Sequence, residues 1–302
     1  MAYESNETAE RAQVLAHCPA AQPADYADFS CLRAQLQRAP ATWPLPPPLQ
    51  GGNGDCWLLS AVTGLQCFHP HILSDAIEMR ERVAVVRFPR EAPVHVNYVF
   101  PLQTQHCWAG VVRISAPSDL YWALLEKAVC VLFFRRDEDA CFTKRRRFGW
   151  HTRESAPHYV DLFGGHVSEA LQLLVPQTLP LPVRVSPHLD ANEFLRCSLS
   201  GLFFLEVPRP DGWHAVLVFA RTATALCVQD SGGAITNMVP LSGGVLRYYA
   251  IPAARLEPPA FSFPHSILMF CSSWGMVEPV QNVALAYSDA RGLTRSTEAQ
   301  PS

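Results

Sequence analysis

The sequence predicts an α+β protein with helices mainly in the first half of the chain and strands mainly in the second. Apolar residues recur at helical spacing in several segments before residue 175. After residue 198, short runs rich in β-branched and aromatic residues alternate with turn residues. With 302 residues, 49% of them hydrophobic, the chain is long enough for two subdomains. We expect an N-terminal extension over 1–49, a helical subdomain over 50–164 and a β-rich subdomain over 165–302.

The first half is expected to contain two well-marked helices with strands between them. Residues 1–49 look irregular, because prolines keep this part extended, although a short helix fits within it. The expected elements, in order, are a short helix over Asp28–Gln37, a helix over Cys56–Gln66, strands over Val83–Phe88, Val94–Phe100 and Gly110–Ile114, and a helix over Ser118–Val129.

A charged stretch over Arg135–Arg147 separates these elements from the second half, and such stretches are usually solvated loops. A turn at Asp161–Gly165 then leads into a helix through Val167–Leu174. The remaining expected elements are strands over Leu199–Val207, Trp213–Ala220, Ala225–Gln229 and Leu246–Ile251.

Composition excludes several classes of function. The net charge of −3 and the pI near 6.4 give no basic excess for nucleic acid. No apolar run reaches the roughly 18 residues of a membrane span, and the first ten residues lack the apolar core of a signal peptide. The ten cysteines form no Cys-x-x-Cys pair, which favours free thiols in a reducing, intracellular compartment.

Lysine is rare, occurring only at Lys127 and Lys144, while arginine supplies the other cations. A GC-rich genome explains this bias without any function. Selection against ubiquitin acceptor sites, in a protein that acts inside a foreign host cell, explains it as well. We therefore expect the chain in the cytoplasm, either its own cell's or that of a host.

One segment combines a glycine-rich turn with a cysteine at the start of a predicted helix. Gln50 is followed by Gly-Gly-Asn-Gly-Asp, and Cys56 then begins the run Cys-Trp-Leu-Leu-Ser-Ala. At a helix N-terminus, unpaired N–H groups and the helix dipole favour a thiolate. Gln50 supplies an amide that can donate a hydrogen bond to the oxyanion formed when a thiolate attacks a carbonyl. Most cysteines are buried and inert, but glycines before a helix indicate exposed backbone, so we expect Cys56 to be a nucleophile.

Four segments resemble, in the same order, the catalytic core of calpain-type cysteine proteases. They are Gln50–Trp57, matching Gln-Gly-x-x-Gly-Asp-Cys-Trp; Leu120–Ala128, similar to Trp-x-x-Leu-Leu-Glu-Lys-Ala; Asp161–Glu169, similar to Asp-Phe-Thr-Gly-Gly; and Gly212–Ala215, at the place of Gly-His-Ala. The resemblance implies a papain-like fold of two subdomains, a helical half with Cys56 and an antiparallel β half, with the site between them. It also implies that Trp57 flanks the cleft.

His214 is the expected general base, and Asp230 the group that orients it. His214 follows a Pro-Asp-Gly turn and precedes an apolar strand, so its imidazole should stand at a strand end. Asp230 ends the next expected strand, where the family has asparagine in Asn-Pro-Trp-Gly. Here the sequence is Asp-Ser-Gly-Gly, so the tryptophan that shields this contact is missing. We expect Asp230 to accept a hydrogen bond from His214 Nδ1–H.

These residues predict an intracellular cysteine endopeptidase that cleaves protein substrates through Cys56, His214, Asp230 and Gln50. A deubiquitinase or acyl transferase using the same thiol, and a catalytically inactive interaction module, are the alternatives. No cofactor is required by this chemistry. Calcium binds to the family's core, but its ligand sets have no match here, so we expect weak or no calcium dependence. The acidic residues of the first half that could contribute calcium ligands are Asp55, Asp137, Glu138 and Asp139.

Overall fold

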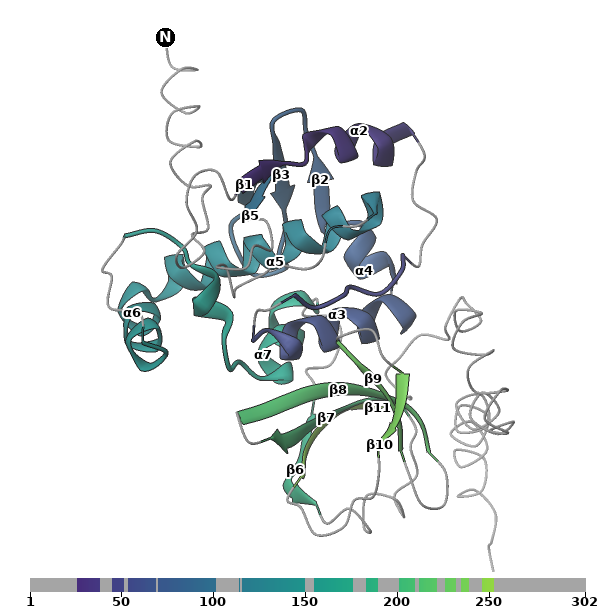
Figure 1. Ribbon diagram of the computed structural model, residues 1–302. Helices are drawn as coiled ribbons and strands as arrows, with labels where there is room; N and C mark the ends of the chain where they lie inside the picture. The colour runs from purple at the N-terminus through teal and green to yellow at the C-terminus, as the bar shows by residue number, and fades with distance from the viewer. Residues whose placement is uncertain are drawn as a thin grey trace, which may run out of the picture.

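The computed structural model describes thirteen parts of the chain. These are residues 26–38, 45–51, 54–68, 70–101, 114, 116–149, 155–175, 183–189, 201–209, 212–221, 226–231, 235–238 and 246–252. Helices and antiparallel sheets are combined in it, so the α+β class predicted from the sequence is confirmed (Figure 1). Among the described residues, no helix is both long and apolar enough to cross a lipid bilayer.

The part before residue 176 contains the helices and two small antiparallel sheets. The helices are α2 (Ser30–Arg38), α3 (Cys56–Phe68), α4 (Pro70–Ser74), α5 (Pro117–Arg136), α6 (Glu138–Arg147), the 3₁₀ turn η2 (Tyr159–Leu162) and α7 (Val167–Leu174). One sheet pairs β1 (Tyr26–Asp28) with β5 (Val99–Pro101), and the other contains β2 (Ile77–Met79), β3 (Val83–Val86) and β4 (Val94–Asn97).

The part after residue 182 forms one six-stranded antiparallel sheet with the order β10-β9-β8-β7-β11-β6. Its strands are β6 (Val183–Leu189), β7 (Gly201–Arg209), β8 (Gly212–Arg221), β9 (Leu226–Asp230), β10 (Ile235–Met238) and β11 (Leu246–Pro252). The central strands β7 and β8 are nearly continuous apolar runs, and residues 204–207 and 215–218 are all buried. A strand that is buried on both faces has this composition.

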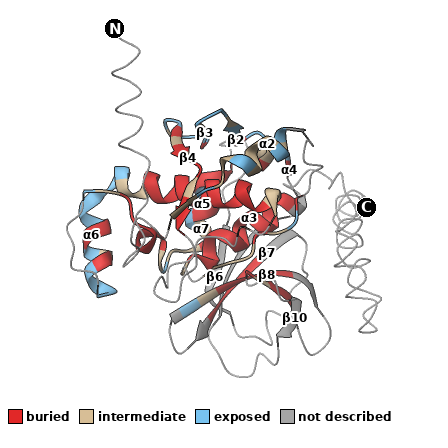
Figure 2. Ribbon diagram, turned by 45° about the horizontal axis from the view of Figure 1, so that its top comes forward, coloured by how far each residue is buried: buried red, intermediate tan, exposed pale blue. Residues whose placement is uncertain are grey.

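Helix α3 joins the two parts, because it packs on the sheet with one side and on α4 and α7 with others (Figure 1). Every described side chain from Cys56 to Gln66 is buried, which explains why this helix is apolar all round. Ser60 Oγ donates a hydrogen bond of 2.9 Å to the Ala215 carbonyl of β8. Figure 2 shows α3 and α5 buried along most of their described lengths.

Several predicted elements are confirmed and others need correction. The helices over Cys56–Gln66 and Val167–Leu174 exist, as do strands in the four predicted places of the second half. The predicted strand over Val94–Phe100 is wrong as a single element. It divides at Tyr98 into β4 and β5, which join different sheets, and Asn97 Oδ1 accepts a hydrogen bond of 3.1 Å from Val99 N at the division. The strand predicted over Gly110–Ile114 lies outside the described residues, except for Ile114.

The solvated loop predicted for Arg135–Arg147 is also wrong. Helix α5 continues to Arg136, and α6 begins at Glu138 with Asp137 as its N-cap, whose carboxylate accepts a hydrogen bond of 2.8 Å from Ala140 N. Three residues of α6 are buried, namely Cys141, Phe142 and Arg145. The charged segment is therefore a helix whose other cations are mostly exposed, while Arg145 points into the protein.

Candidate active site

Cys56 is the first residue of α3, and its sulfur faces strand β8. The carbonyl of Asp55 accepts hydrogen bonds from Leu58 N at 2.9 Å and Leu59 N at 3.2 Å, which begins the helix. The backbone N–H of Ala215 points at Cys56 Sγ, with a distance of 3.4 Å between nitrogen and sulfur. The thiol therefore lies at a helix N-terminus, where the helix dipole favours negative charge. The exposed position expected from the preceding glycines is wrong, because Cys56 is buried, with 7% exposure.

His214 and Asp230 meet on one face of the sheet. In the antiparallel pair β8–β9, Val216 lies opposite Asp230, and His214 is two residues before Val216. Residues at i and i+2 share a face, so His214 and Asp230 are diagonal neighbours. His214 Nε2 lies 3.0 Å from Asp230 Oδ2, with side-chain exposures of 13% and 25%.

The expected contact through His214 Nδ1 is therefore wrong, because the nitrogen that faces Asp230 is Nε2. The His214 ring projects from near the start of β8, and its Nε2 lies next to the carboxylate of Asp230 at the end of β9. This orientation makes Nδ1 the ring nitrogen that is not in contact with the carboxylate.

The surroundings of His214 favour its protonated form. Burial alone lowers the pKa of an imidazole, since it disfavours the charge. The Asp230 carboxylate and the Cys56 sulfur beside the ring favour the charged imidazolium, outweigh burial and raise the His214 pKa to about 9. An imidazolium beside Cys56 is thus stabilised through neutral pH.

Gln50 lies beside the same cluster and connects it to the segment after β9. Its backbone N–H donates a hydrogen bond of 2.8 Å to the Ser231 carbonyl, and the Ser231 hydroxyl donates to Gln50 Oε1. Its Nε2 donates a hydrogen bond of 3.2 Å to Asp55 Oδ1. The amide orientation is thereby fixed, with Oε1 toward Ser231 and Nε2 toward the residue that precedes Cys56.

Trp57, expected to flank the cleft, is instead 1% exposed, so that expectation is wrong. Its Nε1 donates a hydrogen bond of 2.8 Å to the Leu162 carbonyl, and its ring stacks on Phe133 with centroids 5.7 Å apart. Gly165 lies so close that a Cβ there would be 2.3 Å from Trp57 Cε2. The indole is therefore a structural support of the helix that begins at Cys56.

The predicted acidic candidates for calcium do not gather into one group. Asp55 is buried beside Gln50, and Asp137 caps α6. Across the described parts of the chain, no three His, Cys, Asp or Glu side chains are grouped as metal ligands.

The structure thus brings the four predicted site residues together, and it adds Asp55 and Ser231, which sequence reasoning missed as parts of this cluster. Both are adjacent to a predicted site residue, but only the fold shows that they meet Gln50. No protein-family model matches the chain, and no curated protein matches its sequence.

Proposed function

We propose that this chain is a cysteine endopeptidase with a papain-like, calpain-type catalytic core. The observation that carries the proposal is the pairing of His214 with Asp230 beside the thiol that begins α3: His214 Nε2 lies 3.0 Å from Asp230 Oδ2, and the next residue, Ala215, donates its N–H to Cys56 Sγ at 3.4 Å. A cysteine protease needs a thiol, a base within hydrogen-bonding reach and a third group that orients the base. Residues from three separate elements meet these requirements here.

The reaction follows from these positions. With Nε2 held by Asp230, Nδ1 of His214 takes the Cys56 proton and gives a thiolate–imidazolium pair. The thiolate attacks the substrate carbonyl, and the developing oxyanion accepts hydrogen bonds from Gln50 Nε2 and the Cys56 backbone N–H. His214 then protonates the leaving amine, and water hydrolyses the thioester.

Two alternatives use the same residues differently. A deubiquitinase or acyl transferase would use the same thiol with an isopeptide substrate or another acceptor. An inactive interaction module would keep the fold without turnover, but the joint presence of Gln50, Cys56, His214 and Asp230 in one cluster favours an enzyme, because loss of activity does not preserve such a set.

A thiol-directed epoxysuccinyl reagent separates these possibilities. We expect it to label Cys56 and to spare Cys31, an exposed cysteine of α2. Cys56→Ala should lose labelling and peptide hydrolysis, whereas Cys31→Ala should keep both. Equal labelling of both thiols, or hydrolysis that survives Cys56→Ala, would contradict the proposal.

The substrate class is tested by two further measurements. Mass-spectrometric profiling of a cell lysate, comparing wild type with Cys56→Ala, should yield new internal protein termini that only the wild type produces. If a ubiquitin bearing a C-terminal electrophile labels Cys56 while no internal protein cleavage is found, the deubiquitinase reading replaces the endopeptidase.

A further inference from the structure

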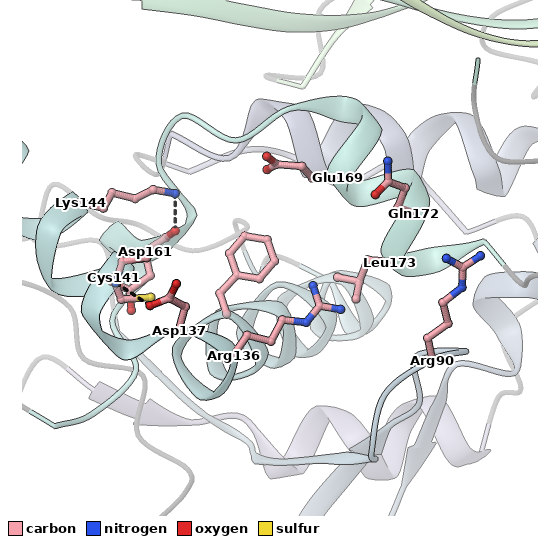
Figure 3. A pocket seen from close by; sticks show the side chains of 11 residues that line it. Arg90, Arg136, Asp137, Cys141, Lys144, Asp161, Glu169, Gln172 and Leu173 are labelled. Atoms are coloured by element: carbon pink, nitrogen blue, oxygen red, sulfur yellow. Dashed lines mark hydrogen bonds between the residues drawn. The ribbon is translucent and has the colours of Figure 1, made fainter. Parts of the chain in front are cut away.

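A cavity lies in the helical part of the molecule, and no residue of the six-stranded sheet is among those that line it. It has a volume of about 450 Å³ and lies between the end of α5, the helix α6 and the helix α7. Figure 3 shows Glu169 and Gln172 projecting from α7, with Lys144 at one end and Arg90 at the other. A cavity of this size suits a small ligand rather than a protein segment.

The cations that line the cavity have more unused hydrogen-bonding capacity than the carboxylates. Asp137 accepts from Ala140 N, Glu169 accepts from His166 N at 3.3 Å, and the Asp161 carboxylate accepts two hydrogen bonds of 2.7 Å from Arg145. Each acidic group is thus engaged by donors of its own part of the chain.

The basic side chains of the cavity, in contrast, keep hydrogen-bond donors that no described residue accepts. Arg90 has no hydrogen-bond or ion-pair partner among the described residues, and a guanidinium carries five N–H donors. Lys144 Nζ donates to one neutral acceptor, the Asp161 carbonyl, at 2.8 Å. Arg136 pairs with Glu91, the residue after Arg90, so the two arginines are held at the same side of the cavity. An anionic group at that side of the cavity would accept hydrogen bonds from the two guanidinium groups.

Apart from Gln172, the uncharged part of the wall is apolar. Phe133 from α5 and Leu173 from α7 line the cavity, and the side chains of Ala140 and Cys141 belong to its α6 wall. A ligand with an apolar or aromatic body could therefore bury it against these side chains while an anionic group meets the arginines.

We propose that this cavity binds a small amphiphilic anion, a phosphate or carboxylate attached to an aromatic or apolar body, and that its occupancy is transmitted to Cys56. Phe133 is the link, since it lines the cavity and stacks on Trp57, the residue after Cys56. The backbone at Asp161 and Leu162 is a second link. Lys144 donates a hydrogen bond to the Asp161 carbonyl, and the Trp57 indole donates one to the Leu162 carbonyl.

Binding is tested by calorimetry on the full chain with phenyl phosphate as the probe. We expect saturable binding of one equivalent, at least tenfold tighter than that of inorganic phosphate, which lacks the apolar body, and of phenethylamine, which has the opposite charge. Equal affinity for phenyl phosphate and phenethylamine would overturn the assignment of an anion site.

Two variants locate the binding. Arg90→Gln combined with Arg136→Gln should weaken phenyl phosphate binding about tenfold or more, since charged hydrogen bonds are lost. Ala140→Trp should abolish binding by filling the cavity without changing its charge. Arg146→Gln, on an exposed residue of α6 outside the cavity, is the matched control and should bind as wild type. Binding that survives both test variants would overturn the proposal.

Transmission to Cys56 is measured by the rate of its alkylation with iodoacetamide, followed on the Cys56 peptide by mass spectrometry. Saturating phenyl phosphate should change this rate at least twofold in wild type and in Arg146→Gln, but not in Ala140→Trp. An unchanged rate in wild type, with binding intact, would overturn the transmission. Alkylation reports the thiol and not peptide cleavage, so this test stands even if the chain proves not to be a protease.

Discussion

Asp230 stands where the calpain-type pattern has asparagine, and this difference changes the charge beside His214. An asparagine can orient an imidazole through its carbonyl oxygen, but it cannot balance a positive ring. Asp230 does both, because its carboxylate lies 3.0 Å from Nε2 and raises the pKa of His214. The carboxylate is also a quarter exposed, which fits the absence of a tryptophan after it. The effect of Asp230 on activity should therefore depend on pH, because it acts through the charge of His214.

Asp230→Asn should keep much of the activity, whereas Asp230→Ala should lose about 100-fold, because nothing then orients the ring. In wild type, kcat/KM should fall on the alkaline side near pH 9, where His214 loses its proton. Removing the negative neighbour lowers the His214 pKa, so this limb should move to lower pH in Asp230→Asn. The pH profile of peptide hydrolysis measures both effects. Near-wild-type activity in both variants would show that Asp230 is only a turn residue.

Ser231 acts on the site through Gln50, whose amide it orients with one hydrogen bond from its hydroxyl. Gln50→Ala should lower kcat by about 10²–10³, the usual cost of one oxyanion donor. Ser231→Ala should cost less, about tenfold, because the amide remains but is free to turn. The double variant should be no slower than Gln50→Ala alone, as measured by kcat. Additive losses would mean that Ser231 acts independently of Gln50.

At the scale of elements, the segment from η2 to α7 is held against helix α3 by contacts on two sides. Arg145 of α6, 1% exposed, binds both carboxylate oxygens of Asp161, and His158 N donates to the same group at 3.0 Å. Four residues later, Gly165 touches the Trp57 ring. A buried ion pair of this kind is costly to break, since the remaining charge is left without compensation. It therefore holds this segment in a fixed position against α3.

Gly165→Ala should be strongly destabilising, because the added Cβ would lie 2.3 Å from the Trp57 ring, and this buried, stacked ring has little room to move away. Gly54→Ala is the matched control: its Cβ would meet the Phe163 ring at 3.3 Å, and that side chain is only half-buried. We expect a loss of about 2–4 kcal/mol in the free energy of unfolding for Gly165→Ala, and about 1 kcal/mol or less for Gly54→Ala, by urea denaturation. Equal small losses would show that the Trp57 contact relaxes easily.

The sequence predicts these elements unevenly, and the reasons are physical. Helix α3 and strands β7 and β8 are predictable, because their apolar patterns match their burial. Helix α6 is not, because what decides its place is one buried cation and its partner sixteen residues later. The local sequence pattern carries no information about the Arg145–Asp161 ion pair, so the charged segment is predicted to be a solvated loop.

At the scale of the whole molecule, the apolar core continues from α3 into β7 and β8, and polar contacts join the helical part to the sheet near the candidate site. Ser60 reaches the Ala215 carbonyl, and Ser231 reaches Gln50. On the α7 side, the buried carboxylate of Glu206 accepts from Val167 N at 3.2 Å and lies 3.1 Å from His166 Nδ1. The site is therefore assembled by the contact between the parts. The cysteine, the histidine and the aspartate were predictable from motifs, but these joining contacts were not, since they depend on how two chain segments meet.

The pairing of His214 also makes the stability of the molecule depend on pH. A histidine whose pKa rises from 6.5 in the unfolded chain to about 9 in the fold contributes stability that is fully present below pH 6.5 and is lost as the pH rises through 9. A shift of this size corresponds to about 3 kcal/mol, part of it due to Asp230. Asp230→Ala should therefore destabilise the protein more at pH 6 than at pH 10.

Urea denaturation of wild type and Asp230→Ala at both pH values measures this difference directly. Comparing the two proteins at each pH removes the contribution of other titrating groups, because those groups are present in both. We expect the loss of unfolding free energy in Asp230→Ala to be larger by about 1 kcal/mol or more at pH 6. A loss that is equal at both pH values would mean that Asp230 does not stabilise an imidazolium, and the charged pair at the centre of the proposed mechanism would lose its support.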